Sequence, residues 1–233
     1  MIHLYQFAPA WGLPNLSSFC VKIETYLLMA SLPYEKHVTL PMKGPKGKLP
    51  YIEDQGKKIA DSRFIIDYLK ETYGDLLDGD LDAYQKAIVE AMTRLIEDDL
   101  YWGCVYARWG KKDANWEATK QAVFGGLPPL LRAVIPNIAR KQVLKQIYGH
   151  GMGRHTEEEI YHLGKKDIRV LSDVLADKPY FMGDKPTSLD ASAFGLLVNL
   201  LCAPIESPVK DYAGSQQNLV VFCDRILQEY YTS

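Results

Sequence analysis

A proline that opens a short strand constrains the fold of this chain more than any other feature of its sequence. Leu49, Pro50, Tyr51 and Ile52 follow a loop rich in glycine and proline. Because proline has no N–H for a sheet, it fits the first position of a strand, and the bond before it is a candidate cis peptide. The main chain of Leu49 is then free at a short sheet edge, where an extended peptide can pair with it.

A helix start lies just beyond this strand. Asp61 and Ser62 precede an amphipathic run and place a carboxylate and a hydroxyl beside the free N–H groups of a first helical turn. Such a place can hold both ends of a zwitterion. Together with the free edge at Leu49, it predicts a site for a small acidic peptide.

The first 75 residues predict a small α/β domain. Alternation indicates strands, and apolar residues at helical spacing indicate helices. The predicted elements are strands at residues 2 to 7, 34 to 40, 50 to 53 and 57 to 60, and helices at residues 17 to 31 and 62 to 73. Their order is strand, helix, strand, followed by strand, strand, helix.

Residues 83 to 233 predict an all-helical domain, because strand patterns disappear after Gly74 and residues 75 to 82 form an acidic linker. Capping boxes begin at Thr156 and Thr187. The expected helical segments are residues 83 to 108, residues 116 to 149 with breaks near Pro128 and Pro136, residues 160 to 175, residues 191 to 201 and residues 218 to 230.

The composition argues against several classes of function. With 27 basic and 29 acidic residues, the net charge of −2 gives no overall attraction to nucleic acid or anionic membranes. The four cysteines are far apart and form no CxxC pair, which fits a reduced intracellular chain. No leader or membrane span is apparent. We expect a cytoplasmic protein without a nucleic-acid partner.

The histidines show little sign of a metal site. Among the five, only His162 has a partner at helical ligand spacing, Glu158 at i−4. One such pair is weak support for a metal, so we expect none.

The predicted architecture resembles that of the cytosolic glutathione transferases, in which a thioredoxin-like domain precedes an all-helical domain. The resemblance covers most of the chain. It implies that Leu49, before Pro50, pairs with the cysteinyl part of glutathione, and that Asp61 and Ser62 hold the γ-glutamyl end. It also implies glutathione as cosubstrate and a homodimer.

Lysines in the loop before Pro50 are candidates for the glycyl carboxylate of glutathione. Lys48 is the preferred one, with Lys43 and Lys46 nearby. The competing interpretation is an ordinary solvated loop, because runs of charge are usually exposed.

Within this superfamily, the chain is similar to the Fax and metaxin branch. The similarity rests on three segments and their neighbours: residues 13 to 20 with Lys22, Glu24 and Thr25; residues 99 to 102 with Arg108 and Trp109; and residues 151 to 155. The branch usually has proline where this chain has Ser18.

The resemblance places Ser17 at the position of the serine or cysteine that activates the glutathione thiol. One charge-assisted hydrogen bond contributes about 1.5 to 3 kcal/mol, which lowers a thiol pKa by roughly 1 to 2 units from about 8.5. An ordinary helix cap is the competing role of Ser17. Tyr5 is the rival donor, since some classes use a tyrosine near the end of the first strand, and Asn15 and Ser18 lie in the same loop as Ser17.

Other residues near these positions have simpler interpretations. Cys20 is expected to be buried packing on the first helix. Tyr101, Trp102 and Tyr106, followed by Trp109, lie close to one helix face and could line an apolar pocket for the second substrate, although such stripes are more often core.

Three functions follow from the sequence. The leading one is a transferase that activates the glutathione thiol for conjugation to a small electrophilic or apolar substrate. The alternatives are a non-enzymatic, metaxin-like binding or assembly protein, and a glutathione-dependent reductase or isomerase.

Overall fold

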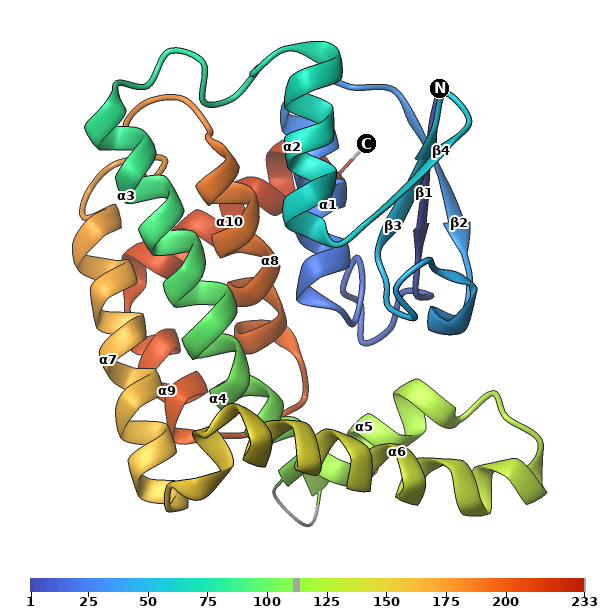
Figure 1. The fold of residues 1–233 in the computed structure, drawn as a ribbon. Coiled ribbons are helices and arrows are strands. Elements are labelled where there is room, and N and C mark those ends of the chain that lie inside the picture. The colour runs from blue at the N-terminus through green and yellow to red at the C-terminus, as the bar shows by residue number, and fades with distance from the viewer. Residues whose placement is uncertain (111–113, 233) are drawn as a thin grey trace.

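The computed structural model describes residues 1–110 and 114–232. A four-stranded sheet with helices α1 and α2 lies beside a larger group of helices (Figure 1). The strand order is β2-β1-β3-β4. The strands are β1 (Ile2–Gln6), β2 (Tyr34–Val38), β3 (Tyr51–Asp54) and β4 (Lys57–Ala60). The predicted thioredoxin-like fold with a helical second half is thereby confirmed.

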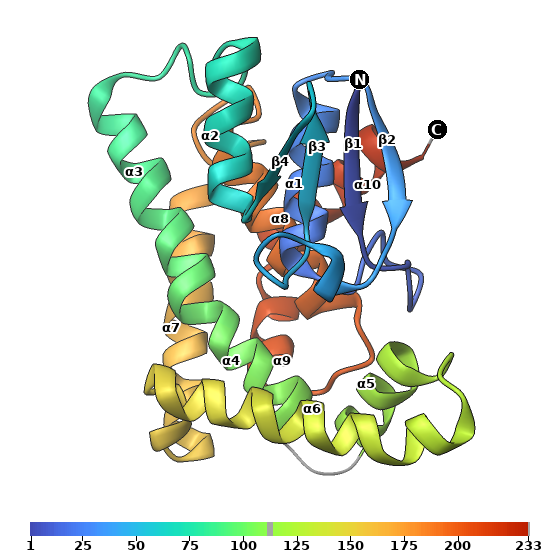
Figure 2. The same cartoon turned by 45° about the vertical axis from the view of Figure 1, so that its right-hand side comes forward.

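Strand β1 occupies an inner position in the sheet, parallel to β2 and antiparallel to β3. Its even-numbered residues, such as Ile2 and Leu4, are buried, whereas His3 and Tyr5 are only partly buried on the opposite face. Figure 2 shows α1 (Ser18–Met29) behind the sheet, with the other face turned to the viewer. The alternation therefore directs one face of β1 into the core and leaves the side chains of its other face partly exposed.

Helices α1 and α2 (Ser62–Tyr73) start close to where the sequence predicts them. Both have a side-chain cap: Ser17 accepts from the N–H of Cys20, and Asp61 accepts from the N–H of Arg63. A side-chain cap is a local interaction, so the signal for each start is present in the neighbouring residues of the sequence.

The first helical run of the second half is not uniform. It consists of α3 (Ala83–Arg94), a π-helical segment (Leu95–Leu100), α4 (Tyr101–Val105) and a second π-helical segment (Tyr106–Gly110). A π turn holds more residues than an α turn, so side chains beyond it are rotated from their α-helical positions. The predicted helix over residues 83 to 108 is present. Side chains beyond each π-helical segment, however, point in other directions than in a continuous α-helix.

Helices α5 (Ala114–Phe124) and α6 (Pro129–His150) form an arm that projects from the body of the molecule (Figure 1). The predicted break at Pro128 is confirmed, because α6 begins with Pro129 at its first position. The predicted break near Pro136 is wrong. Helix α6 continues through Pro136, where the ring removes a main-chain donor without ending the helix.

The remaining helices are α7 (Glu157–Leu175), α8 (Ser188–Cys202), α9 (Pro208–Ser215) and α10 (Gln217–Tyr231). Both predicted capping boxes are present, at Thr156 with Glu159 and at Thr187 with Asp190. Almost all of α8 is buried, which makes it the central helix of the core and packs it against α1. Within the part of the chain that the structure covers, every helix lacks the length or the apolar character needed to cross a bilayer.

The linker between the two halves is anchored at Asp78, which is 2% exposed. Its carboxylate accepts hydrogen bonds from the N–H and the hydroxyl of Ser188 at 2.8 and 2.5 Å and from Lys70 Nζ at 2.5 Å. One buried carboxylate thus connects α2 to the start of α8.

Candidate functional site

A cavity of about 690 Å³ lies where α2, α3 and the loop before β3 meet. Its wall contains seven basic and six acidic side chains, so it suits a ligand that carries charges of both signs. The basic ones are Lys22, Lys46, Lys48, Arg63, Lys70, Lys86 and Arg94, and the acidic ones are Asp61, Asp67, Asp78, Glu90, Glu97 and Asp98.

Leu49 and Pro50 form one edge of this cavity. The peptide bond between them is cis, as the sequence suggested. Across residues 1–110 and 114–232, neither the N–H nor the C=O of Leu49 has a hydrogen-bond partner. Buried main-chain groups rarely remain unpaired, so Leu49 offers a ready donor and acceptor to a peptide in the cavity.

Asp61 and Ser62 lie on the adjoining wall of the cavity. Asp61 has a φ of +84°, an uncommon conformation for a residue other than glycine. Such strain costs on the order of 1–3 kcal/mol and concentrates at ligand sites. Ser62 is 5% exposed and is the first residue of α2, where N–H groups have no partner within the helix.

A buried cation lies directly beside Ser62. Lys22 of α1 is 2% exposed, and its Nζ is 3.4 Å from Ser62 Oγ and 2.5 Å from Glu97 Oε1. The other oxygen of Glu97 accepts from Arg63 Nε at 2.9 Å, and Arg63 also pairs with Asp98 at 2.8 Å. Two cations therefore flank the place where a ligand carboxylate would meet Ser62.

Lys22 enters the sequence prediction only within a family motif, and Glu97 and Arg63 do not enter it. The sequence does indicate that Lys22 is paired. Lys22 shares a helix face with Phe19 and Tyr26, and a lysine on an apolar face needs a buried partner of opposite charge. The identity of that partner, 75 residues away, could not be predicted from spacing.

Ser17 acts as the N-cap of α1. Its Oγ accepts from the N–H of Cys20 at 3.4 Å, and its own N–H donates to Asn15 Oδ1 at 3.1 Å. Of the residues described, those lining the cavity do not include Ser17. Cys20 packs in the same small cluster as Leu49, so the start of α1 lies next to the free edge.

The loop that holds Ser17 is fixed by the helical half. Arg108 Nη1 donates to the carbonyl of Leu16 at 2.9 Å, and Asn199 Nδ2 donates to the carbonyl of Asn15 at 3.2 Å. Arg108 Nη2 also lies 3.3 Å from Asn199 Oδ1. The position of Ser17 therefore depends on residues of both halves, which local sequence patterns do not reveal.

Cys20 is fully buried, as expected from the sequence. Burial raises the pKa of its thiol to about 12. A thiol that stays protonated at neutral pH is a poor nucleophile, so Cys20 is not suited to redox chemistry.

Tyr5 lies on the outer face of the sheet, and Tyr5, like Ser17, is not among the described residues that line the cavity. Its ring stacks between those of His37 and Tyr51, with centroid distances of 4.8 and 4.4 Å. Two of the loop lysines, Lys46 and Lys48, do line the cavity, and Lys46 also lies 4.2 Å from the centre of the Phe64 ring.

Tyr101, Trp102 and Tyr106 do not converge on one pocket. Tyr101 packs against Phe19, with ring centroids 4.9 Å apart, and lines a small cavity beside the main one. Trp102 stacks on His150 of α6 at 4.7 Å, and the hydroxyl of Tyr106 lies 3.4 Å from Glu157 of α7. The predicted common face requires a uniform α-helix, whereas one π-helical segment ends just before Tyr101 and a second begins at Tyr106.

A thioredoxin-like sheet with a cis-proline beside a capped helix start, joined to an all-helical half, defines the glutathione transferase class of fold. The chain belongs to this superfamily. The model of the glutathione S-transferase N-terminal domain matches residues 18–115, and that of the C-terminal domain matches residues 164–226.

The relatives include a protein named as a transferase, Failed axon connections and metaxins. Isoprene-epoxide–glutathione S-transferase from Rhodococcus sp. (strain AD45) is 39% identical over 99% of both chains. Failed axon connections from Drosophila melanogaster is 38% identical over 91% of this chain and 53% of its own length. Metaxin-1 from Mus musculus is 29% identical over 99% of this chain and 75% of its own length. The predicted Fax and metaxin branch is thereby confirmed.

Solved structures confirm the fold at lower identity. The beta-etherase LigF from Sphingobium sp. strain SYK-6 has a TM-score of 0.66 at 17% identity, with 100% of this chain and 99% of that one covered. A glutathione S-transferase of Ceriporiopsis subvermispora, solved in complex with glutathione, has a TM-score of 0.64 at 18% identity over 97% of both chains.

Proposed function

We propose that this chain is a glutathione transferase that binds glutathione in the 690 Å³ cavity and adds its thiol to a small electrophile. The observation that carries the proposal is the unpaired main chain of Leu49 on the same cavity as Asp61 and Ser62. Glutathione offers a peptide main chain, two carboxylates and one ammonium group, which matches this set of partners.

The binding mode follows from the charges. The cysteinyl main chain pairs with Leu49, and the γ-glutamyl ammonium group binds the carboxylate of Asp61. The γ-glutamyl carboxylate binds Ser62 at the positive end of α2, close to Lys22. Lys48, which also lines the cavity, is left for the glycyl carboxylate.

Ser17 is the proposed activating hydroxyl. Its oxygen accepts from the N–H of Cys20, which leaves the hydroxyl proton free to donate to a thiolate. The thiol proton goes to solvent, and the thiolate is stabilised by this hydrogen bond and by the start of α1. Because Ser17 keeps its proton, it needs no partner base.

A small epoxide is the first electrophile to test, because the 39% identical relative is named for isoprene epoxide. The thiolate would attack a ring carbon, the carbon–oxygen bond would break, and the alkoxide would take a proton from solvent. Tyr101 lies beside Phe19 near the same end of α1, where an apolar substrate could be in contact with both rings.

The test compares Ser17→Ala with Tyr5→Phe, using the ultraviolet absorbance of bound thiolate as a function of pH and the rate of epoxide conjugation. Ser17→Ala should raise the pKa of the bound thiol by roughly 1 to 2 units, which is the loss of one charge-assisted hydrogen bond. Tyr5→Phe should change neither quantity, because Tyr5 is on the outer face of the sheet. If Ser17→Ala leaves both unchanged, the proposed role of Ser17 is wrong.

A non-enzymatic binding or assembly role is the second candidate. It is favoured by the metaxin relatives and by the absence of both Ser17 and Tyr5 from the described lining of the cavity. Glutathione binding without turnover of any electrophile in a broad panel would support this role. Product analysis of the same panel would reveal a reductase or isomerase, the third possibility.

A further inference from the structure

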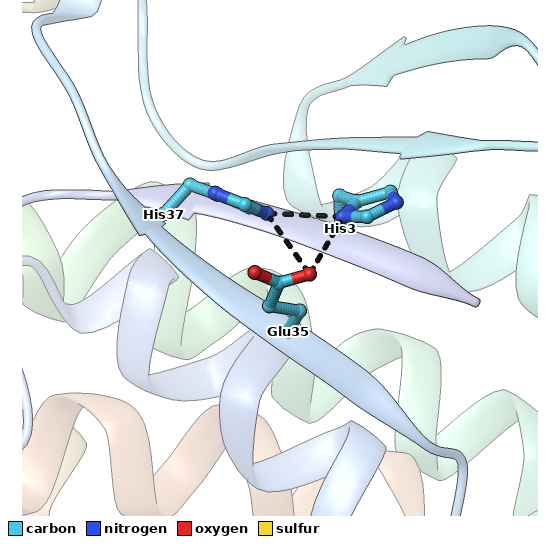
Figure 3. A group of neighbouring side chains, drawn as sticks. All are labelled: His3, Glu35 and His37. Carbon is cyan, nitrogen blue, oxygen red and sulfur yellow. Dashed lines mark hydrogen bonds and ion pairs between the residues drawn. The ribbon is translucent and has the colours of Figure 1, made fainter.

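Three potential metal ligands meet on the outer face of the sheet, away from the cavity. His3 belongs to β1, and Glu35 and His37 belong to β2 (Figure 3). His3 pairs with Glu35 in the parallel register, and Tyr5 pairs with His37. Since alternate residues of a strand share a face, the register itself brings the three side chains together.

The donor atoms have the spacing of a metal site. His3 Nδ1 lies 3.0 Å from His37 Nε2 and 3.4 Å from Glu35 Oε2, and His37 Nε2 lies 3.8 Å from the same oxygen. A triangle with these sides has a circumradius of about 2.0 Å, so one ion can lie at the usual zinc distance from all three atoms.

The cluster is built on rigid elements. Two of its members come from the edge strand β2 and one from the adjacent strand β1, and the ring of His37 stacks on Tyr5 with a centroid distance of 4.8 Å. Ligands on strands hold their geometry better than ligands on loops, so little ordering is needed when an ion binds.

We propose that His3, Glu35 and His37 form a binding site for a divalent transition-metal ion, and specifically Zn²⁺. Two neutral imidazoles and one carboxylate suit zinc, and three protein ligands leave a fourth position open for water. The Glu35 side chain is 57% exposed, so this position faces solvent. The ion would tie the edge strand β2 to β1.

This site is independent of the proposed transferase function, because none of its residues lines the glutathione cavity. Spacing along the sequence gave no sign of it: His3 and His37 are 34 residues apart and meet only through strand pairing. A pattern of alternating residues in two adjacent parallel strands could have indicated it.

The test is a zinc titration of the tag-free full chain, without glutathione or chelator, by calorimetry or by competition with a chromophoric zinc indicator. One equivalent should bind. His3→Gln and His37→Gln should each weaken binding by at least about tenfold, since loss of even an outer partner of a ligand costs 10- to 100-fold. His155→Gln is the matched control, because exposed His155 lies 3.6 Å from Glu159, and within residues 1–110 and 114–232 this pair belongs to no group of three potential ligands.

Two further measurements separate ligation from folding. The melting temperature of each variant in chelator should equal that of the wild type, and zinc should raise the melting temperature of the wild type but not of the double variant. The site does not exist if micromolar zinc fails to bind, or if His3→Gln and His37→Gln bind zinc as well as the wild type does. In that case the three side chains form only a hydrogen-bonded cluster.

Discussion

Lys22 Nζ lies 2.5 Å from Glu97 Oε1, and this buried ion pair joins the α/β half to the helical half immediately beside Ser62. The two side chains are 3% and 6% exposed. Removal of one partner from a buried pair leaves a charge without compensation, which costs about 3–5 kcal/mol. The pair therefore makes the candidate glutathione site sensitive to the contact between the halves.

Glu97→Gln should destabilise the protein more than Lys22→Met. Glu97→Gln leaves the Lys22 ammonium buried without a carboxylate, whereas Lys22→Met leaves Glu97 paired with Arg63. The expected losses are about 3–5 kcal/mol for Glu97→Gln and less for Lys22→Met, measured by urea unfolding. The double variant should be more stable than Glu97→Gln alone.

The control for this pair is Lys185→Met, whose partner Asp80 is 89% exposed. An exposed pair contributes at most about 1 kcal/mol, so this variant should unfold almost as the wild type does. Equal losses for the buried and exposed lysines would show that the Lys22 pair does not hold the halves together.

Asp78→Ala should also be strongly destabilising. It removes the acceptor for the N–H and hydroxyl of Ser188 and for Lys70, three donors at the junction of the halves. A loss of at least about 2 kcal/mol is expected, because hydrogen bonds to a charged group contribute about 1.5–3 kcal/mol each. Thermal unfolding should show this loss for Asp78→Ala and not for Asp80→Ala, an exposed aspartate in the same linker.

Asp167 should make stability depend on pH. Burial first, and the nearby charge of Asp99 second, raise the pKa of its carboxyl to about 7, and one of its oxygens has no hydrogen-bond partner. The folded state therefore holds a proton that the unfolded state releases near pH 4, so this group reduces stability progressively between about pH 4 and pH 7.

Asp167→Asn should abolish this dependence. The variant should exceed the wild type in melting temperature at pH 8, and the difference should shrink at pH 5. Asp173→Asn, on the same helix and 70% exposed, should show no such trend. A constant difference between Asp167→Asn and the wild type across this range would contradict the assignment.

Features set by short segments could be predicted from the sequence. Pro50 predicted the strand start because proline lacks an N–H, and it predicted the cis bond because the tertiary amide before proline has only a weak preference for trans. Asp61 and Thr187 predicted helix starts because their oxygens cap free donors. The alternation in β1 also predicts that Tyr5 and Leu4 face opposite ways, as the structure shows.

Features set by contacts across the chain could not be predicted. The π-helical segments on either side of α4 leave no local signal in the sequence, and the contact of the Tyr106 hydroxyl with Glu157 of α7 is set by tertiary packing. Lys22 and Glu97 are 75 residues apart, and their pairing depends on how the two halves dock. Such contacts follow from tertiary packing and not from periodicity.

The most direct test of the account is calorimetric titration of glutathione into the wild type, Ser62→Ala and the control Ser215→Ala, an exposed serine at the end of α9. We expect one glutathione per chain and unchanged affinity in Ser215→Ala. Ser62→Ala should bind at least about tenfold more weakly, because it loses one hydrogen bond to a carboxylate. Absence of binding at millimolar glutathione, or equal affinity in all three proteins, would contradict the account.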